Sequence, residues 1–135
     1  MNSELLEAAK QAMANAYARY SGFHVGAAIL AENGKIYSGC NVENAAYPIG
    51  NCAEASAIAA MVRDGAREIR EIAIIGGKQG RASAACMPCG GCRQRILEFA
   101  VDSTQIHIFT AAGLHRTYAC KELLPDSFGP KDVAG

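Results

Sequence analysis

The chain has 135 residues, half of them hydrophobic, which is enough for one hydrophobic core and too short for two comfortable ones. Thirteen basic residues balance thirteen acidic ones, so the Lys and Arg surplus that DNA or RNA binding normally needs is missing. We therefore expect a single domain over residues 1–135 that binds a small ligand of little charge and no nucleic acid.

The beginning of the sequence carries charge throughout and lacks the basic start and apolar centre of a signal peptide. No apolar run approaches the length needed to cross a bilayer. These features predict a cytoplasmic protein with no membrane partner, in a compartment where thiols stay reduced. Six cysteines in such a chain indicate metal binding or catalysis before they indicate disulfides.

Hydrophobic periodicity predicts a helix that begins near Ser3 in the first segment of the chain. The stretch "HVGAAILAENGKIYSGCNV" predicts two strands joined by a tight turn at Asn33-Gly34, a dipeptide typical of hairpins. After a loop, "ENAAYPIGN", a second helix is expected from about Cys52 to Asp64.

The second part of the chain begins with "EIAIIGG", a continuous apolar run that predicts a buried central strand. A loop rich in Gly, Ala and Ser leads to a third helix at about 90–99. Two more strands are expected in "QIHIFTA" and "HRTYA", then one helical turn in "KELLP" and a tail. This order of elements implies a mixed sheet covered by helices, in the α/β class.

A cysteine pair in "CMPCGGCRQ" is the strongest chemical motif. Cys89 and Cys92 have the two-residue gap that lets both thiolates reach one metal ion from a turn that enters a helix. The same spacing also occurs in redox dithiols and in half of a zinc finger. The pair alone therefore leaves these alternatives open.

A third candidate ligand stands in "NCAEASAI", where Cys52 lies two residues before Glu54. Both cysteine segments open predicted helices, and helix N-termini favour thiolates. Three protein ligands leave the fourth zinc position open, as in catalytic zinc sites, and a carboxylate beside it can transfer protons. A histidine as fourth ligand would make the site structural. Cys86 lies near the pair and could replace one of the three ligands in a shifted register. Apart from that alternative, the remaining cysteines are expected to be ordinary core or surface residues: Cys40, Cys86 and Cys120.

The chain resembles the small homotetrameric cytidine deaminases from Tyr20 to Pro130. Five segments carry this resemblance, in this order: "SGFHVGAAI", "GCNVENAAYP", "CAE", "PCGGCRQ" and "ELLPDSFGP". The resemblance implies a three-layer α/β/α sandwich with a mixed five-stranded sheet. It also implies one Zn²⁺ per subunit, bound by Cys52, Cys89 and Cys92, with Glu54 as the catalytic residue. The implied reaction is the hydrolytic deamination of cytidine and 2′-deoxycytidine in pyrimidine salvage.

The resemblance also assigns substrate contacts. Asn41 and Glu43 would bind the ribose, Phe23 would pack on the pyrimidine ring, and the carbonyl of Ala53 with the N–H of Cys89 would hold that ring. Three further residues would reach a pocket of a neighbouring subunit: Ala45, Tyr47 and Phe128. Asn41 and Glu43 have the alternative role of capping the backbone of their own turn. Phe23 has the alternative role of an ordinary core residue.

One position departs from the family pattern, because Ala55 follows Glu54 where many three-cysteine members have an arginine. Arg93 remains available to donate to the zinc thiolates, or another arginine substitutes. Substrate choice is thus less determined than the type of reaction. A deaminase of a modified cytosine nucleoside, such as blasticidin S, is the enzymatic alternative, and a non-catalytic zinc-stabilised module is the alternative from another class.

Overall fold

The computed structural model describes residues 3–134, so the outermost residues of the domain expected over 1–135 lie outside the described part. Its regular elements, in chain order, are α1 (Ser3–Ala14), β1 (Phe23–Ala31), β2 (Ile36–Cys40), the 3₁₀-helix η1 (Tyr47–Ile49), α2 (Ala53–Arg63), β3 (Ile69–Lys78), α3 (Gly90–Phe99), β4 (Ala100–Thr110), β5 (Gly113–Ala119), α4 (Cys120–Leu123) and α5 (Pro130–Ala134). Within residues 3–134, no helix is long and apolar enough to cross a membrane.

The five strands form one sheet in the order β2-β1-β3-β4-β5. Strand β3 lies at its centre, antiparallel to β1 and parallel to β4, while β2 and β5 pair antiparallel at the two edges. The apolar run predicted to be a central strand is confirmed, with residues 72–77 all buried. Since a parallel pair needs a crossover connection, the chain between β3 and β4 leaves the sheet, and that crossover carries α3.

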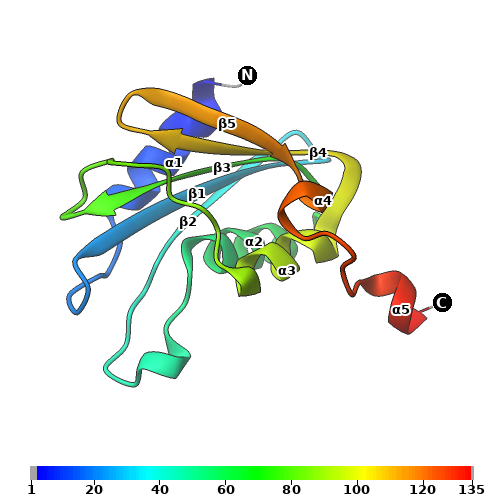
Figure 1. Cartoon of the computed structure of the whole chain (residues 1–135), viewed down its shortest axis with the longest axis horizontal. Coiled ribbons are helices and arrows are strands. Elements are labelled where there is room, and N and C mark those ends of the chain that lie inside the picture. The colour runs from blue at the N-terminus through cyan, green and yellow to red at the C-terminus, as the bar shows by residue number, and fades with distance from the viewer. Residues whose placement is uncertain (1–2, 135) are drawn as a thin grey trace.

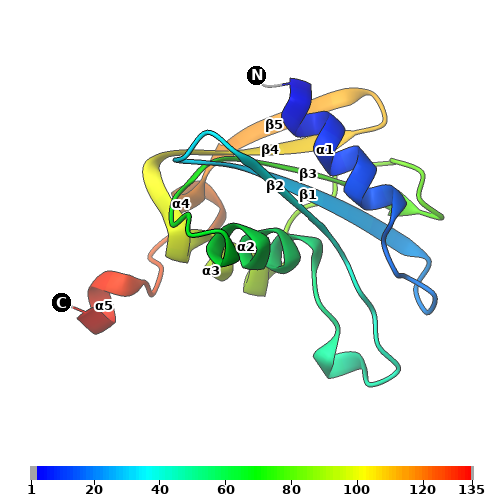
Figure 2. The same ribbon diagram turned by 180° about the vertical axis from the view of Figure 1, so that it is seen from behind.

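Helices cover both faces of the sheet, which confirms the three-layer α/β/α sandwich (Figures 1 and 2). On one face, α1 buries Leu5, Ala9 and Met13 against alternate strand residues such as Ala73 and Ile75. On the opposite face, α2, α3 and α4 pack on the intervening positions of the same strands. Successive side chains of a strand point to opposite faces, so each central strand contributes to both cores.

Two short helices lie where only a loop and a tail were expected. Pro48 stands within the single turn of η1, and Pro130 opens α5, where its fixed φ suits a first helical turn. The backbone N–H of Gly129 donates to the Asp132 carboxylate (2.8 Å), which caps α5. The excursion 41–52, which contains η1, and the segment with α5 both project from the body of the fold (Figure 1).

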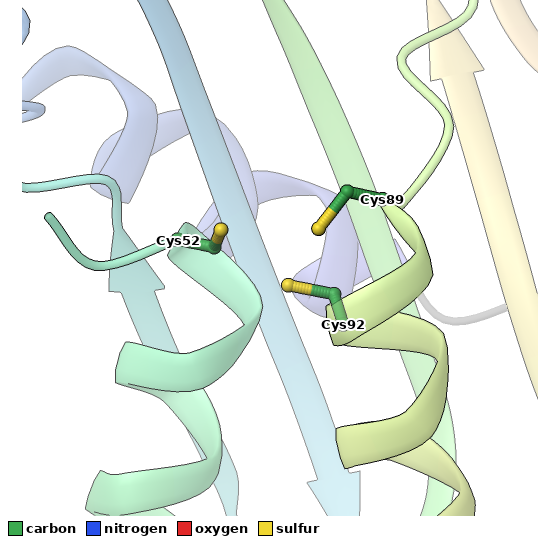
Figure 3. A group of neighbouring side chains, drawn as sticks. All are labelled: Cys52, Cys89 and Cys92. Carbon is green, nitrogen blue, oxygen red and sulfur yellow. The ribbon is translucent and has the colours of Figure 1, made fainter. Parts of the chain in front are cut away.

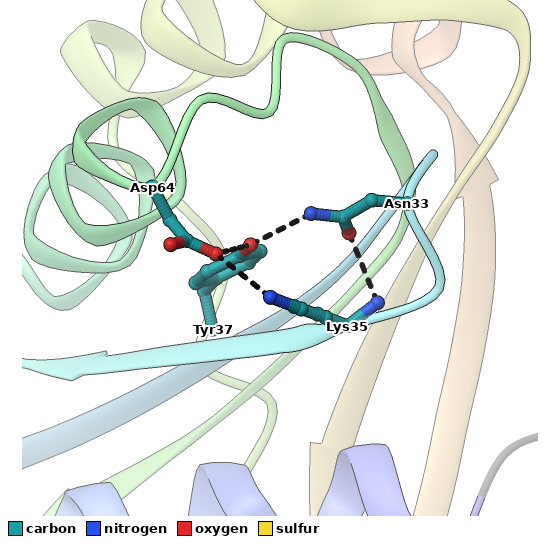
Figure 4. A network of polar contacts seen from close by, with 4 residues as sticks. All are labelled: Asn33, Lys35, Tyr37 and Asp64. Carbon is teal, nitrogen blue, oxygen red and sulfur yellow. Dashed lines mark hydrogen bonds and ion pairs between the residues drawn. The ribbon is translucent and has the colours of Figure 1, made fainter.

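A polar network ties the β1–β2 hairpin to the end of α2 (Figure 4). The Tyr37 hydroxyl donates to Asp64 Oδ2 (2.5 Å) and accepts from Asn33 Nδ2 (2.8 Å), while Lys35 Nζ lies 3.5 Å from Asp64 Oδ2. The Tyr37 hydrogen bond, with the charge of Lys35, holds the pKa of the Asp64 carboxyl below its usual value. The network therefore fixes the C-terminal end of α2, the helix whose other end carries the cysteine and glutamate singled out above.

This network predicts a pH-dependent contribution to stability. A lowered folded-state pKa stabilises the protein above the pKa of an unfolded Asp, about 3.9, and the effect is lost as the pH falls through the folded-state pKa. Asp64→Asn should lower the urea midpoint at pH 7, and the difference from wild type should be smaller at about pH 3, because the effect fades as the pH falls towards the lowered folded-state pKa. Asp102→Asn, at an exposed position of β4, is the control; an equal deficit of Asp64→Asn at both pH values would contradict the charge argument.

Candidate active site

Three cysteine side chains converge where α2 and α3 begin (Figure 3). Cys52 is the N-cap residue of α2, Cys89 is the N-cap residue of α3, and Cys92 lies in the first turn of α3. Their sulfur atoms all lie within 4.8 Å of one another. The structure therefore brings together the three residues that the sequence predicts as zinc ligands.

The cluster fits a zinc ion. A tetrahedral site with Zn–S bonds of about 2.3 Å places its sulfurs roughly 3.8 Å apart, which is compatible with three sulfurs that lie within 4.8 Å of one another. Thiolates are the ligands that zinc prefers, and the positive ends of two helices favour them. Within residues 3–134 the group contains cysteines only, so a histidine as fourth protein ligand is not found there. The donor set is that of a three-ligand site.

The three thiols differ in their electrostatic surroundings. The backbone N–H of Cys92 lowers the pKa of the exposed Cys89 thiol, whereas burial raises the pKa of the Cys52 and Cys92 thiols. A coordinated thiol is deprotonated outright by the metal. Metal binding at this cluster is therefore accompanied by release of protons.

Glu54, the second residue of α2, contributes a carboxyl group to the same place. Its side chain is only 4% exposed, and burial raises its pKa. A buried carboxyl with a raised pKa is suited to accept and return protons near neutral pH.

A cleft of about 350 Å³ opens above the cysteine cluster and Glu54. This volume is in the range of small-molecule sites. Its apolar lining includes Phe23, Val25 and Met87, and its polar lining includes Asn41 and Glu43. Ala53 also lines it, and so does Tyr47, for which the resemblance implied a contact in a neighbouring subunit's pocket.

The two polar side chains are already held by backbone groups. Asn41 accepts from the N–H of Val25 (2.8 Å) and donates to the carbonyl of Phe23 (2.9 Å), which fixes its amide against β1. Glu43 accepts from the N–H groups of Tyr20 and Ser21 (2.9 and 3.0 Å) and from the Ser21 hydroxyl. The Ser21 hydroxyl hydrogen bond lowers the Glu43 pKa, so this carboxyl is an oriented, ionised acceptor.

The start of α2 packs unusually close to the sheet at Gly39 of β2. A Cβ atom there would lie 2.4 Å from the backbone N of Ala57 and 2.8 Å from the carbonyl oxygen of Ala53. Only the absence of a side chain permits this approach. Gly39 thereby sets the position of the helix turn that carries Cys52 and Glu54.

Other predicted site residues lie elsewhere. Ala45 and Phe128 are exposed and do not line the cleft of their own chain. Arg93, expected to donate to the thiolates, donates to the carbonyls of Pro88 (2.8 Å) and Leu123 (3.1 Å). Arg95 instead approaches a ligand sulfur, with its Nη1 3.9 Å from Cys92 Sγ.

Some residues of the cleft were not singled out from the sequence. Val25 and Met87 read as ordinary core residues, and their apolar character gives no local signal of a ligand. Cys86, expected in the core or on the surface, is half-buried and lines the cleft, and burial raises its pKa to about 11. It does not belong to the group of three metal-binding thiols.

Comparison with known proteins agrees with this site. The family model for the cytidine and deoxycytidylate deaminase zinc-binding region matches residues 1–108. The cytidine deaminase of Sporosarcina psychrophila is 40% identical over 131 residues, which cover 97% of this chain and 93% of that protein. The crystal structure of cytidine deaminase from Burkholderia pseudomallei superposes with a TM-score of 0.83 at 38% identity, covering 95% of this chain and all of the other. The crystal structure of the enzyme from Mycobacterium tuberculosis gives 0.79 at 38% identity, covering 93% of this chain and 95% of the other.

The fold and the thiol cluster with its neighbouring carboxyl define a zinc-binding deaminase. The chain belongs to the cytidine and deoxycytidylate deaminase family.

The close approach at Gly39 predicts a specific coupling between packing and metal binding. Gly39→Ala should lower the free energy of unfolding by about 3 kcal/mol, the upper range for overpacking, and should also weaken zinc binding because it displaces the start of α2. Gly26→Ala is the matched control: its Cβ would lie 1.9 Å from the carbonyl oxygen of Ala9 in α1, on the opposite face of the sheet.

Unfolding in urea and zinc competition with a chelator, both on folded protein at low temperature, measure the two effects. We expect both variants to lose stability and only Gly39→Ala to lose zinc affinity. Equal zinc affinities in the two variants would show that Gly39 does not position the metal ligands.

Proposed function

We propose that this protein is a zinc-dependent hydrolase that deaminates cytidine and 2′-deoxycytidine to uridine and 2′-deoxyuridine, with release of ammonia. The observation that carries the proposal is the position of the buried Glu54 carboxyl in one cleft with three thiols suited to zinc. The relatives named cytidine deaminases, alike over nearly the whole chain, support the substrate class.

Cys52, Cys89 and Cys92 would hold the metal ion. A zinc ion with three protein ligands supplies, when bound, a water acidic enough to give hydroxide near neutral pH. Glu54 would accept one proton of the attacking water and pass it to N3 of the cytosine ring, and would then carry the remaining proton from the new C4 hydroxyl to the amino group, which leaves a C4 carbonyl. The water oxygen bonds to C4, the bond from C4 to the amino nitrogen breaks, and ammonia leaves.

The walls of the cleft suit a pyrimidine ring. Phe23 packs against the ring face, since aromatic side chains contribute large apolar contacts to ligand sites. The carbonyl of Ala53 and the N–H of Cys89 stand at the starts of α2 and α3, where they fix the ring's orientation above the metal ligands.

Asn41 and Glu43 would recognise the sugar. Each keeps hydrogen-bonding capacity beyond its contacts to the backbone: a second N–H on the Asn41 amide and free lone pairs on the Glu43 carboxylate. Their target is chiefly the 3′-hydroxyl, which ribose and 2′-deoxyribose share, so both nucleosides are substrates. This pair of ribose-binding groups disfavours a blasticidin-type substrate.

A second copy of the chain would complete the pocket. Phe128 is 63% exposed and Tyr47 is 74% exposed, and both stand on or beside segments that project from the fold (Figures 1 and 2). Exposed aromatic side chains of this size are typical of interfaces. We infer a homotetramer in which Phe128 covers a base in a neighbouring cleft, while Ala45 and Tyr47 reach towards a neighbour's ribose.

We place the reaction in the cytoplasm, in pyrimidine salvage, with one domain and one zinc ion per chain. Support comes from the cysteines, which are all six free and include three metal-binding thiols that need a reducing compartment.

The proton-transfer role of Glu54 gives the first test of this function. Glu54→Gln should reduce ammonia release from cytidine and 2′-deoxycytidine by about 10²–10⁴-fold, the range for loss of a general acid–base group, while one zinc ion per chain is retained. Glu98→Gln, on the exposed side of α3, is the control and should keep wild-type turnover.

Cytosine and blasticidin S are offered separately in the same assay. Turnover of blasticidin S alone would assign the modified-nucleoside alternative. Zinc binding without turnover of any of the four compounds would contradict the proposal and favour a non-catalytic module.

The role of Phe128 across an interface is tested by mixing two inactive chains. Phe128→Ala and Glu54→Gln should each be poorly active alone, and their co-expressed mixture should recover about a quarter of wild-type activity per chain if subunits mix at random. Recovery arises because a Glu54→Gln subunit supplies Phe128 to a neighbour that has Glu54. Light scattering gives the subunit number; no recovery in tetramers of mixed composition would assign Phe128 to its own chain or to neither pocket.

A further inference from the structure

Arg95 brings a positive charge to the cysteine cluster from α3. It follows Cys92 by three residues, a spacing that places two side chains on the same side of a helix. Its Nη1 atom lies 3.9 Å from Cys92 Sγ, within hydrogen-bonding distance for sulfur. The guanidinium is thus directed at a ligand atom and not at solvent alone.

The loaded cluster has a charge that such a group offsets. Three thiolates around one divalent zinc leave a net negative site, and a cationic donor to a thiolate reduces that excess. Arg93, next to Cys92, donates to the carbonyls of Pro88 and Leu123. Ala55, next to Glu54, brings no charge. Of Arg93, Ala55 and Arg95, only Arg95 therefore brings a cationic donor to a ligand sulfur.

Gly91 provides the space that the guanidinium occupies. A Cβ atom at Gly91 would lie 3.2 Å from Arg95 Nη1 and 3.9 Å from Cys89 Sγ. The first distance is tighter than an ordinary van der Waals contact, so an alanine there would require the guanidinium to shift by a few tenths of an ångström. A Cβ at the preceding Gly90 would meet no atom within 4 Å. Of these two adjacent glycines, only Gly91 stands where a side chain would disturb Arg95.

We propose that Arg95 is a positioning residue for the zinc thiolates, seated in the space left by Gly91, and that it stabilises the metal-loaded cluster. The inference rests on the zinc site of the proposed function and not on the substrate. Because Arg95 acts through the Cys92 sulfur, its removal changes how the metal is held even when no nucleoside is present.

Zinc affinity, measured by competition with a chromogenic chelator, tests this role without an activity assay. Arg95→Met keeps the aliphatic stem and removes the charge, and it should weaken zinc binding by about 10–100-fold, the usual effect of losing an outer-shell partner. Arg95→Lys should restore part of the affinity. Arg63→Met, which removes a charge from the far end of α2, is the control and should bind zinc like wild type.

Cobalt substitution gives a spectroscopic readout that a merely structural role would not move. The thiolate-to-cobalt charge-transfer band of Arg95→Met should shift relative to wild type, because the Cys92 thiolate loses a donor. Wild-type zinc affinity together with an unshifted band in Arg95→Met would overturn the proposal. A wild-type chain that holds no zinc would overturn the zinc site itself, and with it this inference.

The role of Gly91 is tested by a double-mutant cycle. Gly91→Ala should weaken zinc binding less than Arg95→Met does, and Gly90→Ala, the matched control, should not weaken it. In the Arg95→Met background, Gly91→Ala should have little further effect, because the side chain it displaces has lost its charge. Full additivity of the two changes would show that Gly91 acts independently of Arg95.

Discussion

Two helices that are far apart in the sequence must begin at one point in space, and the site depends on this constraint. Cys52 opens α2, and Cys89 opens α3 after the chain has crossed from β3 towards β4. Both helices lie on the same face of the sheet (Figure 2), so their N-termini can meet above it. Their convergence assembles the thiols, brings in Glu54 and directs two positive helix ends at the same spot.

The same convergence determines the electrostatics of the site. Burial opposes ionisation of Glu54 and of two of the thiols, while a backbone N–H favours it at Cys89. The protein therefore concentrates potential negative charge at a place where water screens it poorly. The Arg95 guanidinium approaches that charge from α3, and a bound metal ion would supply further positive charge.

Much of this arrangement follows from local sequence patterns. The approximate bounds of α2 and α3 and the grouping of the three cysteines were predictable, because helical periodicity and cysteine spacing act over short range. Arg93 was the arginine expected beside the thiolates, but in the structure Arg95 makes that contact. Helix geometry indicates this difference. Each residue turns about 100° around the axis, so position 93 leaves the side of Cys92 and position 95 returns to within about 60° of it. The apolar residues Val25 and Met87 gave no signal, since only the three-dimensional packing separates a pocket wall from a core.

The residues that line the cleft come from two differently supported parts of the fold, the starts of α2 and α3 and the excursion 41–52. The thiol cluster and Glu54 stand on helix starts packed against the sheet, whereas Asn41 and Glu43 stand at the beginning of a projecting excursion held by a few hydrogen bonds. If the excursion binds the sugar, as proposed above, substitutions there alter which sugar is accepted and leave the groups at the helix starts unchanged. Under the proposed function, engineering of the substrate range would therefore begin in the excursion and keep Cys52, Glu54, Cys89 and Cys92 unchanged.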